Sequence, residues 1–319
     1  MAYTTADLLE KIRLQAFLPE TSDFTDARLL SLANDHLITV VADRIKASRE
    51  DYWLTFEDIR VTGATTYRLP RRSLARIVRD VKLINTAGVV LDFDNIDPPS
   101  GWVGIGPSTT SYCYYFKDDF IVFPGTPPAG YTMRVWYLRQ PSKLVLTSAA
   151  MQIDHAGSTT SIELAGPVPE TMQTAGTLLD VVYGETPYDL TYTDLRVASW
   201  DSGDPNVITL DPSTPVDPAV ISTVVGNPNG RQDWICLRDQ TVSPQIPEEL
   251  FTTLEGLVVE QVLRMSKDLD GAAAAGAGVL RSMKAAQDLI EPRNEAGSRP
   301  IISRFSPLRG AGAGRRRWR

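Results

Sequence analysis

The sequence has very few of the residues on which metal and thiol chemistry depend. Its 319 residues include two cysteines, Cys113 and Cys236, and two histidines, His36 and His155. Each cysteine lies inside an apolar run far from the other, which is typical of a buried free thiol and leaves a disulfide as the alternative. Neither histidine belongs to a metal-binding or catalytic-triad pattern, so we expect both to be surface or structural residues. The sequence predicts no metal site and no cofactor.

Long apolar runs and phosphate-binding motifs are also absent. No run approaches the roughly 20 residues that span a bilayer, and the N-terminus has no basic start followed by an apolar block, so we expect neither an anchor nor a signal peptide. Gly104 and Gly106 begin a Gly-x-Gly pattern, but Thr109 stands where the third glycine belongs and Pro107 interrupts it. We therefore exclude dinucleotide binding, and the chain has no P-loop motif.

Acidic residues gather at two places in the turn-rich part of the chain. Asp92, Asp94 and Asp97 form one group, and Asp118 and Asp119 form the other. A glycosidase needs two carboxylates about 5 to 10 Å apart, whereas aspartate is common in turns because it bonds to its own backbone. We expect these groups to be turn residues and the protein not to be an enzyme.

Charge is distributed very unevenly along the chain. The segment 292–319 holds eight arginines and a single glutamate, which gives it a net charge of +7. The whole chain has a net charge of −7, so residues 1–291 have a net charge of −14. Glycine and proline break up this segment, which predicts an extended tail without a core of its own. Apolar residues are spaced among the arginines, and this mixture is typical of a segment that binds a protein groove with acidic walls.

A second basic group lies closer to the N-terminus. It consists of Arg68, Arg71, Arg72, Arg76 and Arg79. Its arginines form either a solvated face or an inter-subunit contact with the acidic surface of a neighbouring copy.

The pattern of apolar residues predicts helices at both ends of the chain. Thr4 and Asp7 form a capping signal for a first helix, which Pro19 ends, and a second helix extends from about Asp23 to Arg49. Pro247 begins a further helical region, in which the run 271–278 is either a break or the start of a closely packed helix.

Between these helices, short β-branched and aromatic runs alternate with turn residues, which predicts many strands. The run Ser73–Ile84 fits either a helix or a strand, and residues 117–119 suggest a hairpin. The predicted fold is α+β, a helical bundle with a large inserted antiparallel β region and an extended basic C-terminal tail. We divide the chain into N-terminal helices (1–52), a β domain (53–145), a second β module or excursion (146–241), C-terminal helices (242–291) and the tail (292–319).

Several stretches together resemble the head-to-tail connector, or portal adaptor, proteins of tailed bacteriophages. The segment 51–88 is similar to a family segment in which Tyr-Arg-Leu-Pro (67–70) leads to Arg-Asp-Val-Lys-Leu (79–83). The segment 120–145 resembles the next hairpin and ends in Tyr137, Arg139 and Pro141. The segments 242–263 and 291–310 resemble the family's C-terminal helices and the extended tail that follows them.

The resemblance implies a non-enzymatic virion protein that forms a ring of itself, commonly of about twelve copies. The ring lies in the neck, between the portal and the tail or nozzle proteins, and double-stranded DNA passes through it without specific binding. Assembly is expected in the host cytoplasm. By the resemblance, Arg299, Arg304, Phe305 and Arg309 would dock on the portal protein. From the residue pattern we add the apolar anchors Ile301, Leu308 and Trp318, and the charged end Arg315, Arg316, Arg317 and Arg319, which lies beyond the matched part.

Two alternatives remain open at this point. One is a phage structural protein with cell-wall-degrading (glycosidase) activity, which would need a cleft with converging carboxylates. The other is a basic-tailed DNA-packaging accessory protein, which would bind duplex DNA with a steep dependence on salt. We also expect the free protein to be largely monomeric, with a tail that becomes ordered on binding.

Overall fold

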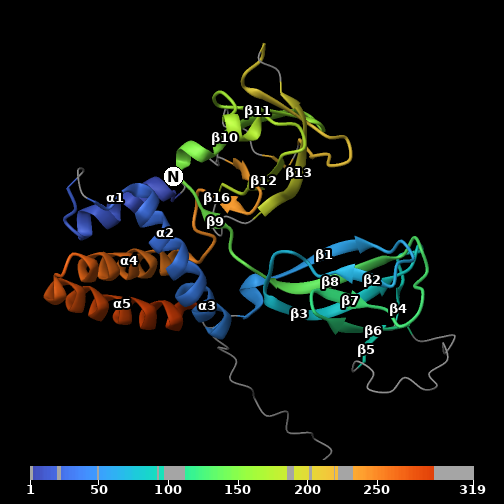
Figure 1. Ribbon diagram of the computed structural model, residues 1–319, viewed down its shortest axis with the longest axis horizontal. Helices are drawn as coiled ribbons and strands as arrows, with labels where there is room; N and C mark the ends of the chain where they lie inside the picture. The colour runs from blue at the N-terminus through green and yellow to red at the C-terminus, as the bar shows by residue number, and fades with distance from the viewer. Residues whose placement is uncertain are drawn as a thin grey trace, which may run out of the picture.

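The computed structural model describes residues 3–19, 23–48, 50–91, 93–96, 112–184, 190–200, 203–218, 220–221 and 233–290. The predicted fold class is confirmed: N- and C-terminal helices pack together around a large inserted antiparallel β region. Figure 1 shows three lobes, a helical bundle, a pair of packed sheets and a small barrel.

Both ends of the chain contribute helices to the bundle. The helical segments are α1 (Thr5–Gln15), α2 (Asp26–His36), a π-helical turn (Leu37–Val41), α3 (Ala42–Ser48), α4 (Phe251–Met265) and α5 (Leu269–Ile290). The predicted capping box is present, because Thr4 and Asp7 bond reciprocally at the start of α1. The predicted second helix is continuous from Asp26 but passes through the π-helical turn, an arrangement frequent at functional positions.

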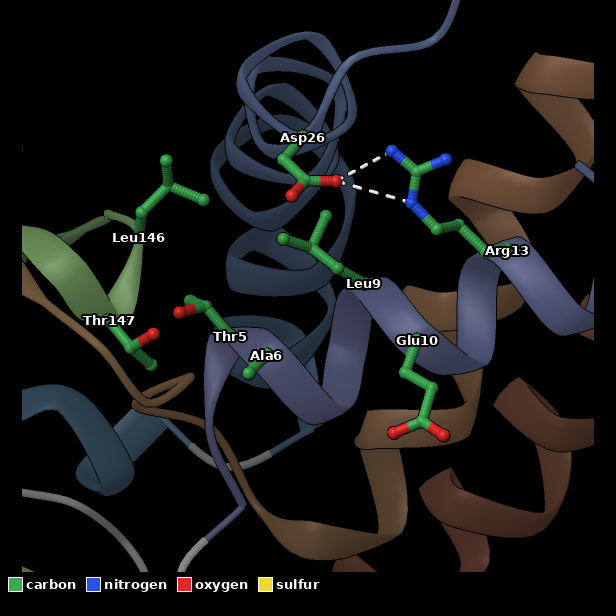
Figure 2. A pocket seen from close by; sticks show the side chains of 8 residues that line it. All are labelled: Thr5, Ala6, Leu9, Glu10, Arg13, Asp26, Leu146 and Thr147. Atoms are coloured by element: carbon green, nitrogen blue, oxygen red, sulfur yellow. Dashed lines mark hydrogen bonds and ion pairs between the residues drawn. The ribbon is translucent and has the colours of Figure 1, made fainter. Parts of the chain in front are cut away.

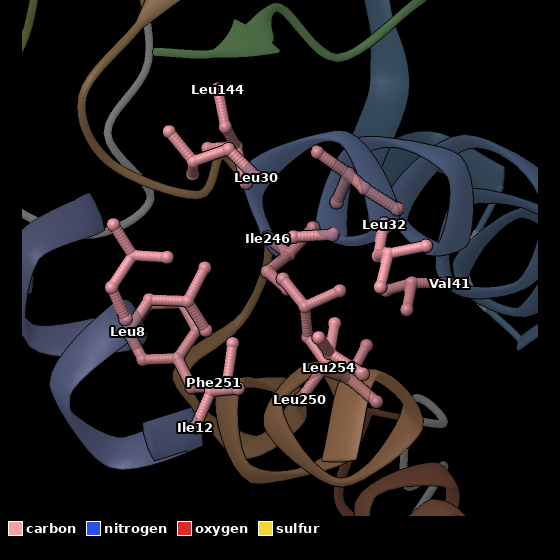
Figure 3. Close-up of a cluster of buried hydrophobic side chains, with 14 of the residues drawn as sticks. Leu8, Ile12, Leu30, Leu32, Val41, Leu144, Ile246, Leu250, Phe251 and Leu254 are labelled. Atoms are coloured by element: carbon pink, nitrogen blue, oxygen red, sulfur yellow. The ribbon is translucent and has the colours of Figure 1, made fainter. Parts of the chain in front are cut away.

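Apolar side chains from the two ends of the chain meet in one core. Figure 3 shows Leu8 and Ile12 of α1 against Phe251 and Leu254 of α4. The ring of Tyr3 stacks on Phe251 with centroids 4.4 Å apart. These contacts join the two ends of the chain. Lys11 of α1 and Glu255 of α4, for example, are in contact although they are 244 positions apart in the sequence.

A buried carboxylate fixes α1 on α4. Glu255 is 1% exposed and accepts hydrogen bonds from the hydroxyl of Tyr3 (2.5 Å), the ammonium of Lys11 (3.1 Å) and the amide of Gln15 (3.3 Å). Three donors satisfy the charge that burial would otherwise penalise.

The β domain consists of two sheets that pack face to face. The first sheet has the order β1 (Leu54–Arg60), β8 (Thr132–Arg139), β3 (Ser73–Ile84) and β4 (Val90–Leu91). The second has the order β2 (Thr66–Arg68), β7 (Phe120–Val122), β6 (Tyr112–Lys117) and β5 (Phe93–Asn95). Val81, Leu83, Ile121, Met133 and Val135 are fully buried between them. The ambiguous run from Ser73 is a strand because it pairs with β8 along most of its length.

The second β module closes into a six-stranded barrel. Its strands, in spatial order, are β10 (Met151–Ser158), β11 (Ser161–Leu164), β14 (Val207–Leu210), β13 (Leu190–Trp200), β12 (Leu178–Val182) and β15 (Trp234–Leu237). Closure leaves the barrel without an open edge, and alternate side chains point into its own core.

A short parallel pair of strands joins the barrel to the bundle. It consists of β9 (Lys143–Leu144) and β16 (Gln240–Thr241). The side chain of Asn34 in α2 donates to the carbonyl of Leu144 (3.0 Å) and accepts from its N–H (2.7 Å). This bond pair fixes the connection to the helices.

Both cysteines are free; Cys236 is buried in β15 and Cys113 is half-buried in β6. Among the helices that the structure describes, none has the length and apolar character needed to cross a membrane.

Candidate functional site: a charged junction between the three lobes

Two arginines from the loop between β2 and β3 reach across to the barrel. Arg72 forms an ion pair with Asp180 of β12, and its Nε lies 2.8 Å from Oδ1 of Asp239. The Nη2 of Arg71 lies 2.8 Å from Oδ2 of the same Asp239, in the turn between β15 and β16. One turn of the barrel therefore holds two consecutive arginines of the sheet domain.

Asp180 is the buried centre of this junction. It is fully buried and accepts the backbone N–H groups of Asp194 (3.0 Å) and Asp239 (2.7 Å). Both donor residues have positive φ, 58° and 62°, a conformation uncommon outside glycine. Burial raises the pKa of Asp180, while Arg72 and the two N–H groups act in the opposite direction. The arrangement is that of a structural anchor, since a buried charge requires this many partners.

The charged group of the junction also includes Asp194, and the buried Tyr137 lies near it. The Nε of Arg238 lies 2.5 Å from Oδ1 of Asp194. Burial, assisted by the charge of Glu57, raises the pKa of Tyr137 in β8 to about 12. The phenol is therefore neutral at physiological pH.

A cavity of about 270 Å³ opens at this junction. It lies where all three lobes meet, because its lining comes from the π-helical turn, the arginine loop, the β8–β9 connection and the barrel turn. The lining residues are Ile38, Arg71, Arg72, Gln140, Pro141, Ser142, Lys143 and Asp239.

The five arginines predicted as an inter-subunit contact have different surroundings. Arg71 and Arg72 belong to the junction, and Arg76 pairs with Asp119 at 2.8 Å. The side chains of Arg71 and Arg76 nevertheless stay 56% and 66% exposed, and Arg68 and Arg79 are exposed as well. Apart from Arg72, which is mostly buried, these arginines remain accessible to a neighbouring chain.

The predicted portal-binding residues, at positions 299–319, lie outside the described residues. The helix before them, α5, includes the small-residue segment 271–278, so this segment is not a break. The helix packs closely on α4. A Cβ built on Gly256 would lie 2.7 Å from Cγ2 of Val279, and the hydroxyls of Thr253 and Ser282 are 3.0 Å apart. The tail therefore follows a tightly packed helical hairpin.

A second cavity, of about 290 Å³, lies between α1, the start of α2 and the loop before β10. Figure 2 shows Leu9 and Glu10 on its helical wall and Leu146 on the opposite side. Arg13 closes one end through an ion pair with Asp26 (2.6 Å). The lining contains no group of residues typical of a catalytic site.

Exposed apolar side chains gather at the outer end of the bundle. Leu14 lies in the last turn of α1 and Phe17 follows that helix, while Met265 ends α4 and Leu269 begins α5. Figure 1 shows the end of α1 and the turn between α4 and α5 at the same end of the bundle. Phe17 is 91% exposed and has a φ of 51°.

The outer face of the first sheet carries another exposed group. The rings of Phe56 and Trp136 are 4.8 Å apart, and the guanidinium of Arg134 lies 4.2 Å from the ring of Phe56. Arg134 also binds both oxygens of Asp58, at 2.7 and 2.8 Å. These residues provide an ordered, partly aromatic surface at the sheet edge formed by β1.

Among the candidate catalytic carboxylates that the structure describes, two lie in a turn and one lies in a strand. Asp118 and Asp119 connect β6 to β7, and Asp118 has a φ of 52°. Asp94 lies in β5, while Asp92 and Asp97, like Gly104 and Gly106, lie outside the described residues. His36 ends α2, and His155 lies on the barrel strand β10.

Sequence reasoning missed the buried carboxylate of the junction. The available signal was Asp180 itself, an acidic residue in the middle of the apolar run 178–183. A charge at such a position requires a buried partner. Its partner, Arg72, is 108 positions away in the sheet domain, and only the contact between that domain and the barrel identifies it.

No protein-family model matches this sequence, and no curated protein matches it significantly.

Proposed function

We propose that this protein is a non-enzymatic structural component of a tailed-phage virion. In this account it is a head-to-tail adaptor that forms a ring beneath the portal, links the DNA-filled head to the tail and lines the DNA exit channel. Its C-terminal tail docks on the portal protein.

The observation that carries the proposal is the place of the basic segment in the sequence, directly after the last helix of the bundle. Both chain ends build one bundle, and the segment with a net charge of +7 follows directly after α5, which ends at Ile290. Because α5 is tightly packed on α4, a force on the tail passes to the whole bundle.

Ring formation has support in the charges and the exposed surfaces. A heterologous contact joins two different surfaces of the same chain and closes into a ring when the rotation permits. Exposed arginines, including Arg71 and Arg76, and a body with a net charge of −14 offer one complementary pair. A negative channel wall would also limit adhesion of DNA during its passage.

The proposal is tested with purified portal rings and full-length variants of the tail. One variant replaces Arg299, Arg304 and Arg309 with alanine, and a second replaces Phe305 and Leu308. We expect each to lower portal affinity at least about tenfold, since interface arginines and aromatic anchors often contribute more than 1.4 kcal/mol. A matched control replaces Arg264, Arg281 and Arg44, which are helical arginines outside the tail.

Unchanged portal affinity in both tail variants would contradict the proposal. The same variants are assayed with duplex DNA at several salt concentrations. Strong duplex binding that is lost with the tail arginines, without portal binding, would favour the DNA-packaging alternative.

A further inference from the structure

The outer surface of the barrel brings together three side chains that bind metal ions in proteins. Asp154 and His155 lie on β10 and Glu163 lies on the neighbouring β11. One possible ligand atom of each lies within 4.8 Å of those of the other two. The side chain of His155 is 43% exposed, so an ion from solution can reach the cluster.

A β-bulge creates this arrangement. Ile153 pairs with Leu164, but the next pair is His155 with Glu163, so Asp154 is an extra residue on β10. Successive side chains of a regular strand point to opposite faces. The bulge allows Asp154 and His155 to lie together on the outside, while Ile153 remains fully buried in the barrel core.

The two ring nitrogens of His155 face different carboxylates. Nδ1 lies 3.4 Å from Oδ2 of Asp154, and Nε2 lies 3.3 Å from Oε2 of Glu163. Metal-binding histidines commonly donate one N–H to a carboxylate, which fixes the tautomer and directs the other nitrogen at the ion. Asp154 is placed to accept from Nδ1, which leaves the lone pair of Nε2 on the side of Glu163.

We propose that this cluster is a binding site for a divalent transition metal ion of the Zn²⁺ class. His155 Nε2 and a carboxylate oxygen of Glu163 are the direct ligands, and Asp154 orients the imidazole. Two ligands about 2.0 to 2.1 Å from a tetrahedral ion are roughly 3.4 Å apart, close to the separation of these atoms. The imidazole favours Zn²⁺, Ni²⁺ or Co²⁺ over Mg²⁺ and Ca²⁺.

The site is independent of the adaptor proposal and has its own consequence for the barrel. The ion connects β10 to β11 beside the bulge, so binding stabilises the folded barrel by mass action. Its remaining coordination positions face outward, where water or a side chain of a neighbouring molecule completes them.

The test is a calorimetric titration of the full-length protein with Zn²⁺, together with the absorption spectrum of the Co²⁺ form. His155→Ala and Glu163→Gln remove one direct ligand each, and Asp154→Asn removes the orienting carboxylate. The sequence contains only two histidines, so His36→Ala is the matched control. Cys113→Ser is included because that thiol is half-buried and free.

We expect one equivalent of Zn²⁺ in the wild type, in His36→Ala and in Cys113→Ser. Affinity should fall at least about tenfold in His155→Ala and Glu163→Gln, and roughly tenfold in Asp154→Asn. In a proton NMR spectrum, the ring signals of His155 should shift on Zn²⁺ addition and those of His36 should not. No binding at millimolar Zn²⁺, or binding that His155→Ala leaves unchanged, would overturn the proposal, and so would loss of binding in Cys113→Ser.

Discussion

Arg72 of the sheet domain is paired with Asp180, a fully buried carboxylate of the barrel that is 108 positions away in the sequence. The same arginine also contacts Asp239, whose N–H donates to Asp180. The sheet domain and the barrel are therefore joined through a shared group of charges centred on the buried Asp180 rather than through an apolar interface alone.

Removal of Arg72 should destabilise the folded protein, because it leaves the buried carboxylate of Asp180 without its cation. In Arg72→Ala the carboxylate of Asp180 loses its cation, and we expect unfolding free energy to fall by about 3 kcal/mol, as for other broken buried pairs. Arg76→Ala is the control, because its pair with Asp119 is largely exposed and should contribute less than about 1 kcal/mol. Urea denaturation of both variants measures the difference, and equal losses would show that the junction is not a buried anchor.

Alkaline pH should destabilise the protein through two buried tyrosines. Burial raises the pKa of both Tyr114 and Tyr137 to about 12, above the value near 10 expected in the unfolded chain. For a group whose folded pKa is raised, the stability it contributes is present below about pH 10 and is lost as pH rises towards 12. Between pH 10 and pH 12 the unfolding free energy of Tyr137→Phe should therefore fall less than that of the wild type. The difference should be at most roughly 3 kcal/mol, which corresponds to a pKa shift of two units.

Thermal unfolding measured between pH 8 and pH 12 tests this expectation, and ultraviolet absorbance follows phenolate formation. Parallel stability curves for the wild type and Tyr137→Phe would contradict it.

Two glycines of the helical hairpin should respond oppositely to alanine. In Gly256→Ala the new Cβ would meet Val279 at 2.7 Å, and we expect a loss of about 1 to 3 kcal/mol from overpacking. In Gly278→Ala the Cβ meets nothing within 4 Å, so higher helix propensity should stabilise by about 0.5 to 1 kcal/mol. Melting temperatures of the two variants that move in the same direction would argue against the close packing of α4 on α5.

Phe17 should destabilise the free protein slightly, and it is placed to contact a partner. Its side chain is 91% exposed and its φ of 51° is unfavourable for a bulky residue. Phe17→Asn removes the strain without loss of packing, and we expect a gain of about 1 kcal/mol in unfolding free energy. If the outer end of the bundle contacts a partner, the same variant should assemble less well; a stability loss on denaturation would contradict this account of Phe17.

The sequence predicted local structure well because local signals were explicit. The capping residues Thr4 and Asp7, the proline at 247 and the alternating apolar runs each act within a few positions. The run from Ser73 could not be assigned, since its conformation depends on pairing with β8, whose residues Thr132–Arg139 lie far along the chain.

Long-range relationships were the part that the sequence could not provide. Closure of the barrel, the pairing of Arg72 with Asp180 and the bulge that brings Asp154 and His155 beside Glu163 all depend on register between distant or irregular strands. Turn geometry fixes register within a hairpin, but strands that are far apart in the sequence have no shared turn to indicate which of them pair.

The most direct test of the adaptor account is a sedimentation experiment with DNA-filled heads that carry their portal. Full-length protein, a truncation at Pro292 and a variant with every tail arginine replaced by lysine are mixed with the heads and sedimented. We expect the full chain to co-sediment and the truncation to stay in solution. The lysine variant should bind less tightly than the full chain, because lysine lacks the bidentate geometry of arginine. If the truncated chain co-sediments as well as the full chain, the tail is not the docking element, and the central claim is wrong.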